Sequence, residues 1–187
     1  MSNVSKIICN TPEEQKRLNY RMHELINDKT ISLVGPANYM LGSGHGEEID
    51  QSDVVIRLNR GYDTCKKYPN DLGTRTDILY SCLIEKSANA GKINLDIIVK
   101  DSVQLICVPP LSDYEGKTEI RPLSENPGEL VELIDYYHYL VNPETVENIY
   151  KVGLSSRIIP SAINEWVRQR ILCKPNTGFL SIYDLIS

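Results

Sequence analysis

Two glycine-containing segments of the sequence have the residue types that bind phosphate groups and sugar hydroxyls. The first follows an apolar run that ends at Val34, and residues 35–46 contain four glycines. Its backbone can therefore adopt positive φ angles or approach a ligand closely. The second is Asn176-Thr177-Gly178, which predicts the start of a helix whose free N–H groups can hold an anion. Both segments suit phosphate binding better than acid–base catalysis.

The glycines of residues 35–46 leave two interpretations open. The segment matches neither the GxGxxG pattern nor a Walker sequence, so it is either a ligand-binding loop or only a tight turn. Arg57 and Asn59 stand at the end of the next apolar run, residues 53–59. Side chains at the carboxyl ends of parallel strands face ligands in α/β proteins, so we expect these two residues to face a ligand.

The spacing of the remaining polar residues indicates no catalytic or metal site. The five cysteines contain no CxxC pair, which argues against zinc, and we expect neither a metal nor a cofactor. His23 and His138 lie in predicted helices and are interpreted as structural residues. His45 lies in the glycine segment but has no partner at a catalytic spacing, so the catalytic residues stay unassigned.

The alternation of apolar runs and helical patterns predicts an α/β fold. Thr11-Pro12-Glu13-Glu14 combines an N-cap, a proline at the first helical position and a capping-box glutamate, so a helix is expected over 11–28. We predict strands at 30–34, 53–58, 77–83 and 103–108, and further helices at 95–99, 129–141, 161–172 and 176–186. This order favours a mostly parallel sheet flanked by helices.

Other segments are less regular. Residues 47–50 form either a short helix or a solvated turn with one buried isoleucine, and residues 145–150 are ambiguous. The polar segment 60–68 is predicted to be an exposed loop, and 111–128 a surface excursion. In the helix at 161–172 we expect an inner face of Ile163, Trp166, Val167 and Ile171, with Arg168 and Arg170 outside.

The composition is that of one globular domain spanning residues 1–187. Hydrophobic residues make up 41% and charged residues 24%, and the net charge of −5 argues against a general attraction to nucleic acid or anionic membranes. No signal peptide and no apolar segment of membrane-spanning length is evident. We therefore expect a reduced, cytoplasmic protein, and the oligomeric state stays open.

Residues 31–76 resemble the large sialyl motif of the sialyltransferases, glycosyltransferase family 29. The resemblance is carried by Gly42-Ser43-Gly44-His45-Gly46, Glu47-Glu48-Ile49-Asp50, Asp53 to Asn59 and Asp71 to Thr76. Residues 175–187 begin with Pro175-Asn176-Thr177-Gly178, which is similar to the opening of the small sialyl motif. The two motifs occur in the family's order.

The resemblance implies a Rossmann-like, single-domain variant of the GT-A fold that binds CMP-sialic acid without a metal. It implies an inverting reaction in which an acceptor hydroxyl, deprotonated by a histidine, displaces CMP. The partners would be a nucleotide-sugar donor and a glycan acceptor. The implied donor-binding residues are Gly35, Asn38, Ser43, Asn59, Asn176, Thr177 and Gly178.

Three departures from the family pattern qualify this expectation. Pro36 stands where the family has a nucleotide-binding asparagine, and Asn38 is a conjectural replacement for it. Ile31 stands where the family has a cysteine, so the disulfide between the two motifs is not expected, which favours a bacterial or viral type of relative. The family segment with the catalytic histidine follows the small motif and is not found here, so we expect a fold that is incomplete at its C-terminus.

Three functions are therefore compatible with the sequence. The first is a sialyltransferase-like glycosyltransferase, or a fragment of one. The second is a non-catalytic module that binds CMP or a nucleotide sugar. The third, an unrelated α/β nucleotide enzyme, is disfavoured by the ordered pair of motifs. The acceptor, the linkage and the donor sugar are not indicated.

Overall fold

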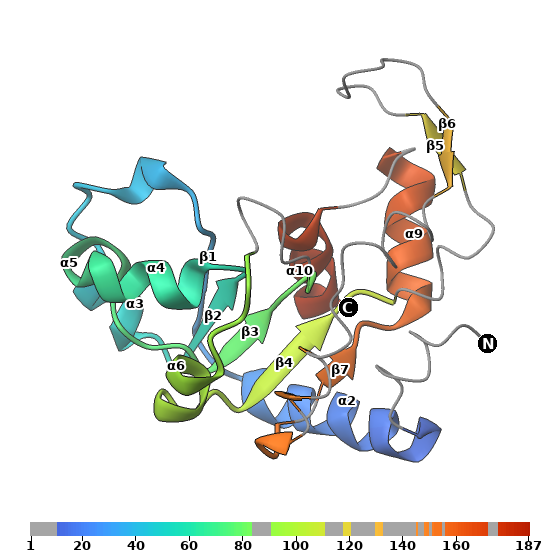
Figure 1. The fold of residues 1–187 in the computed structure, drawn as a ribbon, viewed down its shortest axis with the longest axis horizontal. Coiled ribbons are helices and arrows are strands. Elements are labelled where there is room, and N and C mark those ends of the chain that lie inside the picture. Colours follow the sequence, from blue (N-terminus) through green and yellow to red (C-terminus); the bar gives the residue numbers. More distant parts are fainter. Residues whose placement is uncertain are drawn as a thin grey trace.

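A parallel sheet is the centre of the computed structural model (Figure 1), which describes residues 11–83, 91–110, 118–120, 130–132, 145, 148–149, 151–154, 156–171 and 176–187. Within these ranges, five strands pair in the order β1-β2-β3-β4-β7, all parallel. Their bounds are β1 Ile31–Val34, β2 Val54–Leu58, β3 Ile78–Tyr80, β4 Leu105–Val108 and β7 Ser156–Ile158. The predicted α/β class, with a mostly parallel sheet, is confirmed.

The sheet is covered by helices on both faces, as its apolar strands require. Strands β3 and β4 are buried at every residue, which is typical of parallel strands with both faces covered. Strands β1 to β4 follow one another across the sheet, so right-handed crossovers place the connecting helices on one face. These are α3 Gly46–Gln51, α4 Gly61–Lys67, α5 Pro69–Leu72 and α6 Leu95–Lys100.

The second face is covered by helices from both ends of the chain, α2 Pro12–Ile26, α9 Ser161–Ile171 and α10 Thr177–Ile186. The register places Leu33, Ile56, Ile78 and Leu105 side by side across four strands. Leu18 and Met22 of α2 and Leu180 of α10 pack in the same cluster. The N-terminal helix therefore begins and packs as predicted, with Thr11 Oγ1 accepting a hydrogen bond from Glu14 N at 3.2 Å.

Helix α2 also covers the outer side of β7. The side chain of Gln15 donates to Ser156 O at 3.1 Å and accepts from Ile158 N at 2.8 Å. Strand β7 lies at one side of the sheet that the structure describes, where strands expose unpaired backbone groups. Gln15 thus supplies two hydrogen bonds that a further strand would otherwise supply.

Three predictions about helical segments are wrong, and one open alternative is settled. Residues 60–68 are not an exposed loop, because they form α4, which buries Tyr62 and Cys65. The helix predicted at 129–141 is wrong at its start, where residues 130–132 form strand β6 Leu130–Glu132. This strand pairs with β5 Thr118–Ile120, which lies within the predicted excursion 111–128. Residues 133–141 lie outside the described part. The segment 47–50 is helical, within α3.

The third error concerns the inner face of α9. Val167 is buried, but Trp166 is 41% exposed and Asn164 is fully buried instead. Strand β7 is an addition that the sequence pattern did not indicate, and Thr145, Asn148 and Ile149 are helical. No described helix is long and apolar enough to cross a membrane.

Candidate functional site

The end of β1, the end of β2 and the start of α10 converge on one side chain, that of Leu58. A Cβ atom added to Gly178 would lie 3.2 Å from Leu58 Cδ1, and one added to Gly35 would lie 3.9 Å from the same atom. The backbones of two segments far apart in the sequence therefore approach the last residue of β2 from different elements. We call this region the carboxyl edge, because it is formed at the carboxyl ends of the strands.

Asn59 directly follows Leu58 at the carboxyl edge and joins two strands there. Its backbone has a φ of 49°, a conformation that asparagine tolerates better than most residues. Its N–H donates to Tyr80 O at 2.7 Å, and its Oδ1 accepts from Cys82 N at 3.1 Å. No described residue accepts a hydrogen bond from Asn59 Nδ2, which makes this group a candidate donor to a ligand.

The first turn of α10 supplies further donors. Asn176 caps the helix, with its Oδ1 accepting from Phe179 N at 2.8 Å. The first N–H groups of a helix have no acceptor within the helix, and the side chain of Asn176 accepts only from the N–H of Phe179. The N–H groups of Thr177 and Gly178 therefore extend the donor set beside Leu58, as expected for an anion-binding helix start.

Asn38 and Ser43 lie apart from this group. Asn38 begins a short 3₁₀ helix, η1 Asn38–Met40, and both residues are exposed. Figure 1 shows the segment that contains them arching away from α10. Gly42 and Gly44 have φ values of 83° and 71°, and Gly44 N donates to Asp71 Oδ1 at 2.9 Å, so the glycines shape a turn on the α5 side.

The histidines of the described residues also lie away from the carboxyl edge. His45 precedes α3, where its Nδ1 is 2.9 Å from Glu48 Oε2 and both side chains are exposed. The next residue packs on α5, because a Cβ at Gly46 would be only 2.0 Å from Pro69 O. His23 is an exposed residue of α2, and His138 lies outside the described residues.

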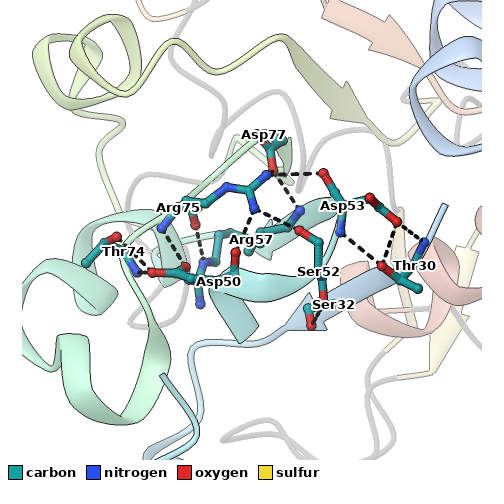
Figure 2. A network of polar contacts seen from close by, with 10 residues as sticks. Thr30, Ser32, Asp50, Ser52, Asp53, Arg57, Thr74, Arg75 and Asp77 are labelled. Atoms are coloured by element: carbon teal, nitrogen blue, oxygen red, sulfur yellow. Dashed lines mark hydrogen bonds and ion pairs between the residues drawn. The ribbon is translucent and has the colours of Figure 1, made fainter. Parts of the chain in front are cut away.

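A second polar cluster lies at the opposite, amino edge of the sheet (Figure 2). We call it the amino-edge network, and it consists of Thr30, Asp50, Ser52, Asp53, Thr74, Arg75 and Asp77. The carboxylate of Asp50 accepts from Thr74 N at 2.7 Å, from Thr74 Oγ1 at 2.9 Å and from Arg75 N at 3.0 Å. It thereby holds the residues that lead into β3 against the end of α3.

Arg75 extends the network across the starts of two strands. Its guanidinium donates to the carbonyl oxygens of Asp50 and Ser52, both at 2.7 Å, and to Asp77 Oδ2 at 2.9 Å. Asp77 in turn accepts from Val55 N at 2.7 Å. Because every partner precedes or begins a strand, the network sets the positions of β2 and β3 and does not face the carboxyl edge.

Arg57 is buried instead of facing a ligand, which corrects the expectation drawn from its place in the sequence. Its side chain is fully buried, and Nε donates to Arg75 O at 3.0 Å. Burial lowers the pKa of the guanidinium, although Cys65 and Asp50 oppose this shift. Its two terminal nitrogens have no hydrogen-bond partner among the residues that the structure describes. Arg57 therefore supports the amino edge and leaves Asn59 as the polar side chain at the end of β2.

The carboxyl edge thus brings together five of the seven donor-binding residues predicted, namely Gly35, Asn59, Asn176, Thr177 and Gly178. Cys82 is a neighbour that the sequence pattern did not indicate. Its thiol is free and half-buried, and its backbone N–H donates to Asn59 Oδ1. Nothing in the described ranges groups three His, Cys, Asp or Glu side chains as metal ligands. The arrangement presents neutral donors for phosphate and hydroxyl groups.

Comparisons with known proteins find a family and a solved structure that resemble this chain. The model of glycosyltransferase family 29 (sialyltransferase) matches residues 1–120. A crystal structure of a mammalian sialyltransferase in complex with Gal-beta-1-3GalNAc-ortho-nitrophenol is 15% identical, with a TM-score of 0.46. The alignment covers 95% of this chain and 69% of that chain. A comparison with curated protein sequences found no match.

Proposed function

We propose that this chain, which belongs to glycosyltransferase family 29 (sialyltransferase), binds a CMP-activated sugar at the carboxyl edge of its sheet. The observation that carries the proposal is the convergence of Gly35, Asn59 and the first turn of α10 on Leu58. In parallel α/β folds ligands bind outside the carboxyl ends of the strands. The reaction proposed is transfer of sialic acid, or a related sugar, from the donor to a glycan hydroxyl.

The proposed roles follow from the donors at this edge. The N–H groups of Thr177 and Gly178 bind the phosphate, whose negative charge is favoured at a helix start. Asn59 Nδ2 donates to the nucleotide, while Oδ1 stays bonded to Cys82 N. Gly35 and Gly178 let the backbone come close because they carry no side chain.

The chemistry proposed is the one that the family resemblance implies. The acceptor oxygen forms a bond to the anomeric carbon as the bond from that carbon to the phosphate oxygen breaks. CMP leaves with the electron pair, and a base takes the proton of the acceptor hydroxyl. The donors at the carboxyl edge stabilise the charge that develops on the leaving phosphate. We propose no metal and no cofactor besides the donor, and cytoplasmic localisation stays a prediction.

A non-catalytic nucleotide-binding module is the second candidate. It is favoured by the positions of His23 and His45, neither of which lies at the carboxyl edge, so the described residues supply no histidine base there. Release of CMP from CMP-sialic acid, measured with and without Gal-beta-1-3GalNAc as a trial acceptor, separates the two functions. Binding of the donor without CMP release favours the module.

The binding proposal is tested by titrating the protein with CMP and measuring affinity calorimetrically for the wild type and for Asn59→Asp. Aspartate keeps Oδ1 for Cys82 N and tolerates a positive φ, but it lacks the Nδ2 donor. We expect affinity to fall by at least about 1–3 kcal/mol, because the variant loses a hydrogen bond to a buried partner and also places a negative charge near the CMP phosphate. Asn38→Ala is the comparison, and a smaller loss is expected because Asn38 lies away from α10.

Amide chemical shifts give an independent readout of the placement. CMP should shift the signals of Asn59 and Thr177, since both flank Leu58. A titration that leaves both signals in place would refute the carboxyl edge as the binding site, even if CMP binds elsewhere. A shift at Ser43 would extend the site to the glycine segment, residues 35–46.

A further inference from the structure

A buried ion pair between Arg157 and Asp184 connects α10 to the rest of the fold. Asp184 lies on α10, seven residues after Thr177. Arg157 of β7 donates from both terminal nitrogens to the carboxylate of Asp184, at 2.6 and 2.9 Å. Tyr80 of β3 donates to the same carboxylate at 2.6 Å. Arg157 Nε also donates to Asn19 of α2 at 2.8 Å. One carboxylate on α10 therefore connects this helix with β3 and β7, and through Arg157 with α2.

The pair is costly to bury, so its presence needs a reason. Arg157 is 5% and Asp184 7% exposed, and Tyr80 is fully buried. Burial alone would lower the pKa of Arg157, but the bonds to Asp184 outweigh it and raise that pKa above its ordinary value. Well-packed apolar residues often hold a fold as well as a buried ion pair does. Apolar contacts, however, are non-directional, whereas an arginine–carboxylate contact with two hydrogen bonds has a defined geometry.

A fixed geometry matters for α10 because its other end contacts Leu58. Thr177 and Asp184 are separated by about 10 Å along the helix, at about 1.5 Å per residue. A helix of this length moves as a unit, so sliding Asp184 would displace Gly178. The contact between Gly178 and Leu58 is close, since an added Cβ would lie 3.2 Å from Leu58 Cδ1. The site therefore tolerates little movement of the helix.

We propose that Arg157 and Asp184 are positioning residues that set the register of α10, so that its first turn meets the donor at the carboxyl edge. The proposal rests on the proposed function, because it assigns to this pair an effect on CMP binding. The pair does not touch the donor, and its effect passes through the helix. Replacing it with apolar residues should preserve the fold and loosen the binding site.

The test is the double variant Arg157→Met/Asp184→Leu, which removes both charges together and leaves neither one buried alone. We expect the double variant to fold, with a urea midpoint lowered only by the loss of the acceptor of the buried Tyr80 hydroxyl, and CMP affinity to be at least fivefold lower. The amide signals of Thr177 and Gly178 should also shift in the free protein. A folded double variant with unchanged CMP affinity would overturn the proposal.

Arg157→Lys is the second variant, in case the double variant does not fold. Lysine keeps the positive charge but cannot form the two-bond contact, so CMP affinity should again fall. Unchanged affinity in a folded Arg157→Lys protein would overturn the positioning role. If the wild type itself fails to bind CMP, the proposed function is wrong, whereas equal binding by wild type and variants refutes the positioning role alone.

Discussion

Asp50→Asn tests the amino-edge network most directly, because one carboxylate accepts hydrogen bonds from three donors of two residues. These donors are Thr74 N, Thr74 Oγ1 and Arg75 N, at 2.7, 2.9 and 3.0 Å. An asparagine offers one acceptor oxygen, and its NH₂ group would face one of these donors. The substitution therefore removes bonds and leaves a donor facing a donor.

The magnitude follows from the number of bonds and the exposure of the side chain. A hydrogen bond to a buried charged group contributes about 1.5–3 kcal/mol. Asp50 is only partly buried, so we use about 1 kcal/mol for each bond, allowing for solvent screening. With two or three bonds lost or weakened, the free energy of unfolding at pH 7 should fall by about 2–3 kcal/mol.

The pH dependence provides a second, independent signature. Burial by itself would raise the pKa of Asp50, but the hydrogen bonds from Arg75 and Thr74 outweigh it and lower the pKa below 3.8. The folded-state pKa is therefore below the unfolded one, so the stabilisation is complete above about pH 4 and is lost as the pH falls through the folded-state value. The difference in the free energy of unfolding between the wild type and Asp50→Asn should therefore become smaller in that acidic range.

The measurement is urea unfolding followed by circular dichroism at pH 7 and at pH 3. Glu47→Gln is the matched control, because Glu47 is an exposed carboxylate of the same helix, α3. We expect the control to stay within about 0.5 kcal/mol of the wild type. If Asp50→Asn at pH 7 behaves like the control, the network does not hold the start of β3, and the reasoning is refuted.

Two further predictions concern packing and thiol reactivity. Gly46→Ala should lower the free energy of unfolding by about 1–3 kcal/mol, because the added Cβ would lie 2.0 Å from Pro69 O. Gly35→Ala is the control and should lower it less, because its nearest contact would be at 3.9 Å. Equal losses of stability in the two variants, measured by urea unfolding, would contradict the packing of α3 on α5. Iodoacetamide at pH 8 should alkylate Cys82 before Cys107, because burial raises the pKa of Cys107 to about 12 and the thiolate is the reactive form. Peptide mass spectrometry would show this order, and faster labelling of Cys107 would contradict its burial.

Local sequence patterns predict the first four strands well, because each is an apolar run of strand length between polar segments. The sequence pattern does not indicate helix α4, since only Gly61, Tyr62 and Cys65 of a polar segment are buried and the partners of the two larger side chains come from elsewhere. Tyr62 OH, for example, accepts from Asn94 N at 2.6 Å. Strand β7 was missed because Arg157 sits at its centre, and the residue that neutralises this charge, Asp184, is distant in sequence.

The error about Arg57 has a specific geometric cause. Arg57 and Asn59 are two residues apart, and in a regular strand such residues point to the same face. Asn59 has a φ of 49°, so the strand geometry ends before it and the alternation no longer applies. Arg57 enters the layer beneath α4, while Asn59 turns to the end of β3. No local pattern in the sequence indicates that positive φ.

The residues of the large sialyl motif, 31–76, lie at both the amino edge and the carboxyl edge of the sheet and have different roles at the two edges. Asp50, Arg75 and Asp77 lie at the amino edge, where they bond backbone groups that begin β2 and β3. Residues that hold strands in place are required whatever ligand is bound, so a match at these positions reports mainly on the fold. Pro36 follows Gly35 at the carboxyl edge, where a ligand would be recognised. If the proposed function holds, its departure from the family pattern bears on how the donor is bound, and we expect Asn59 and the first turn of α10 to provide most of the binding energy.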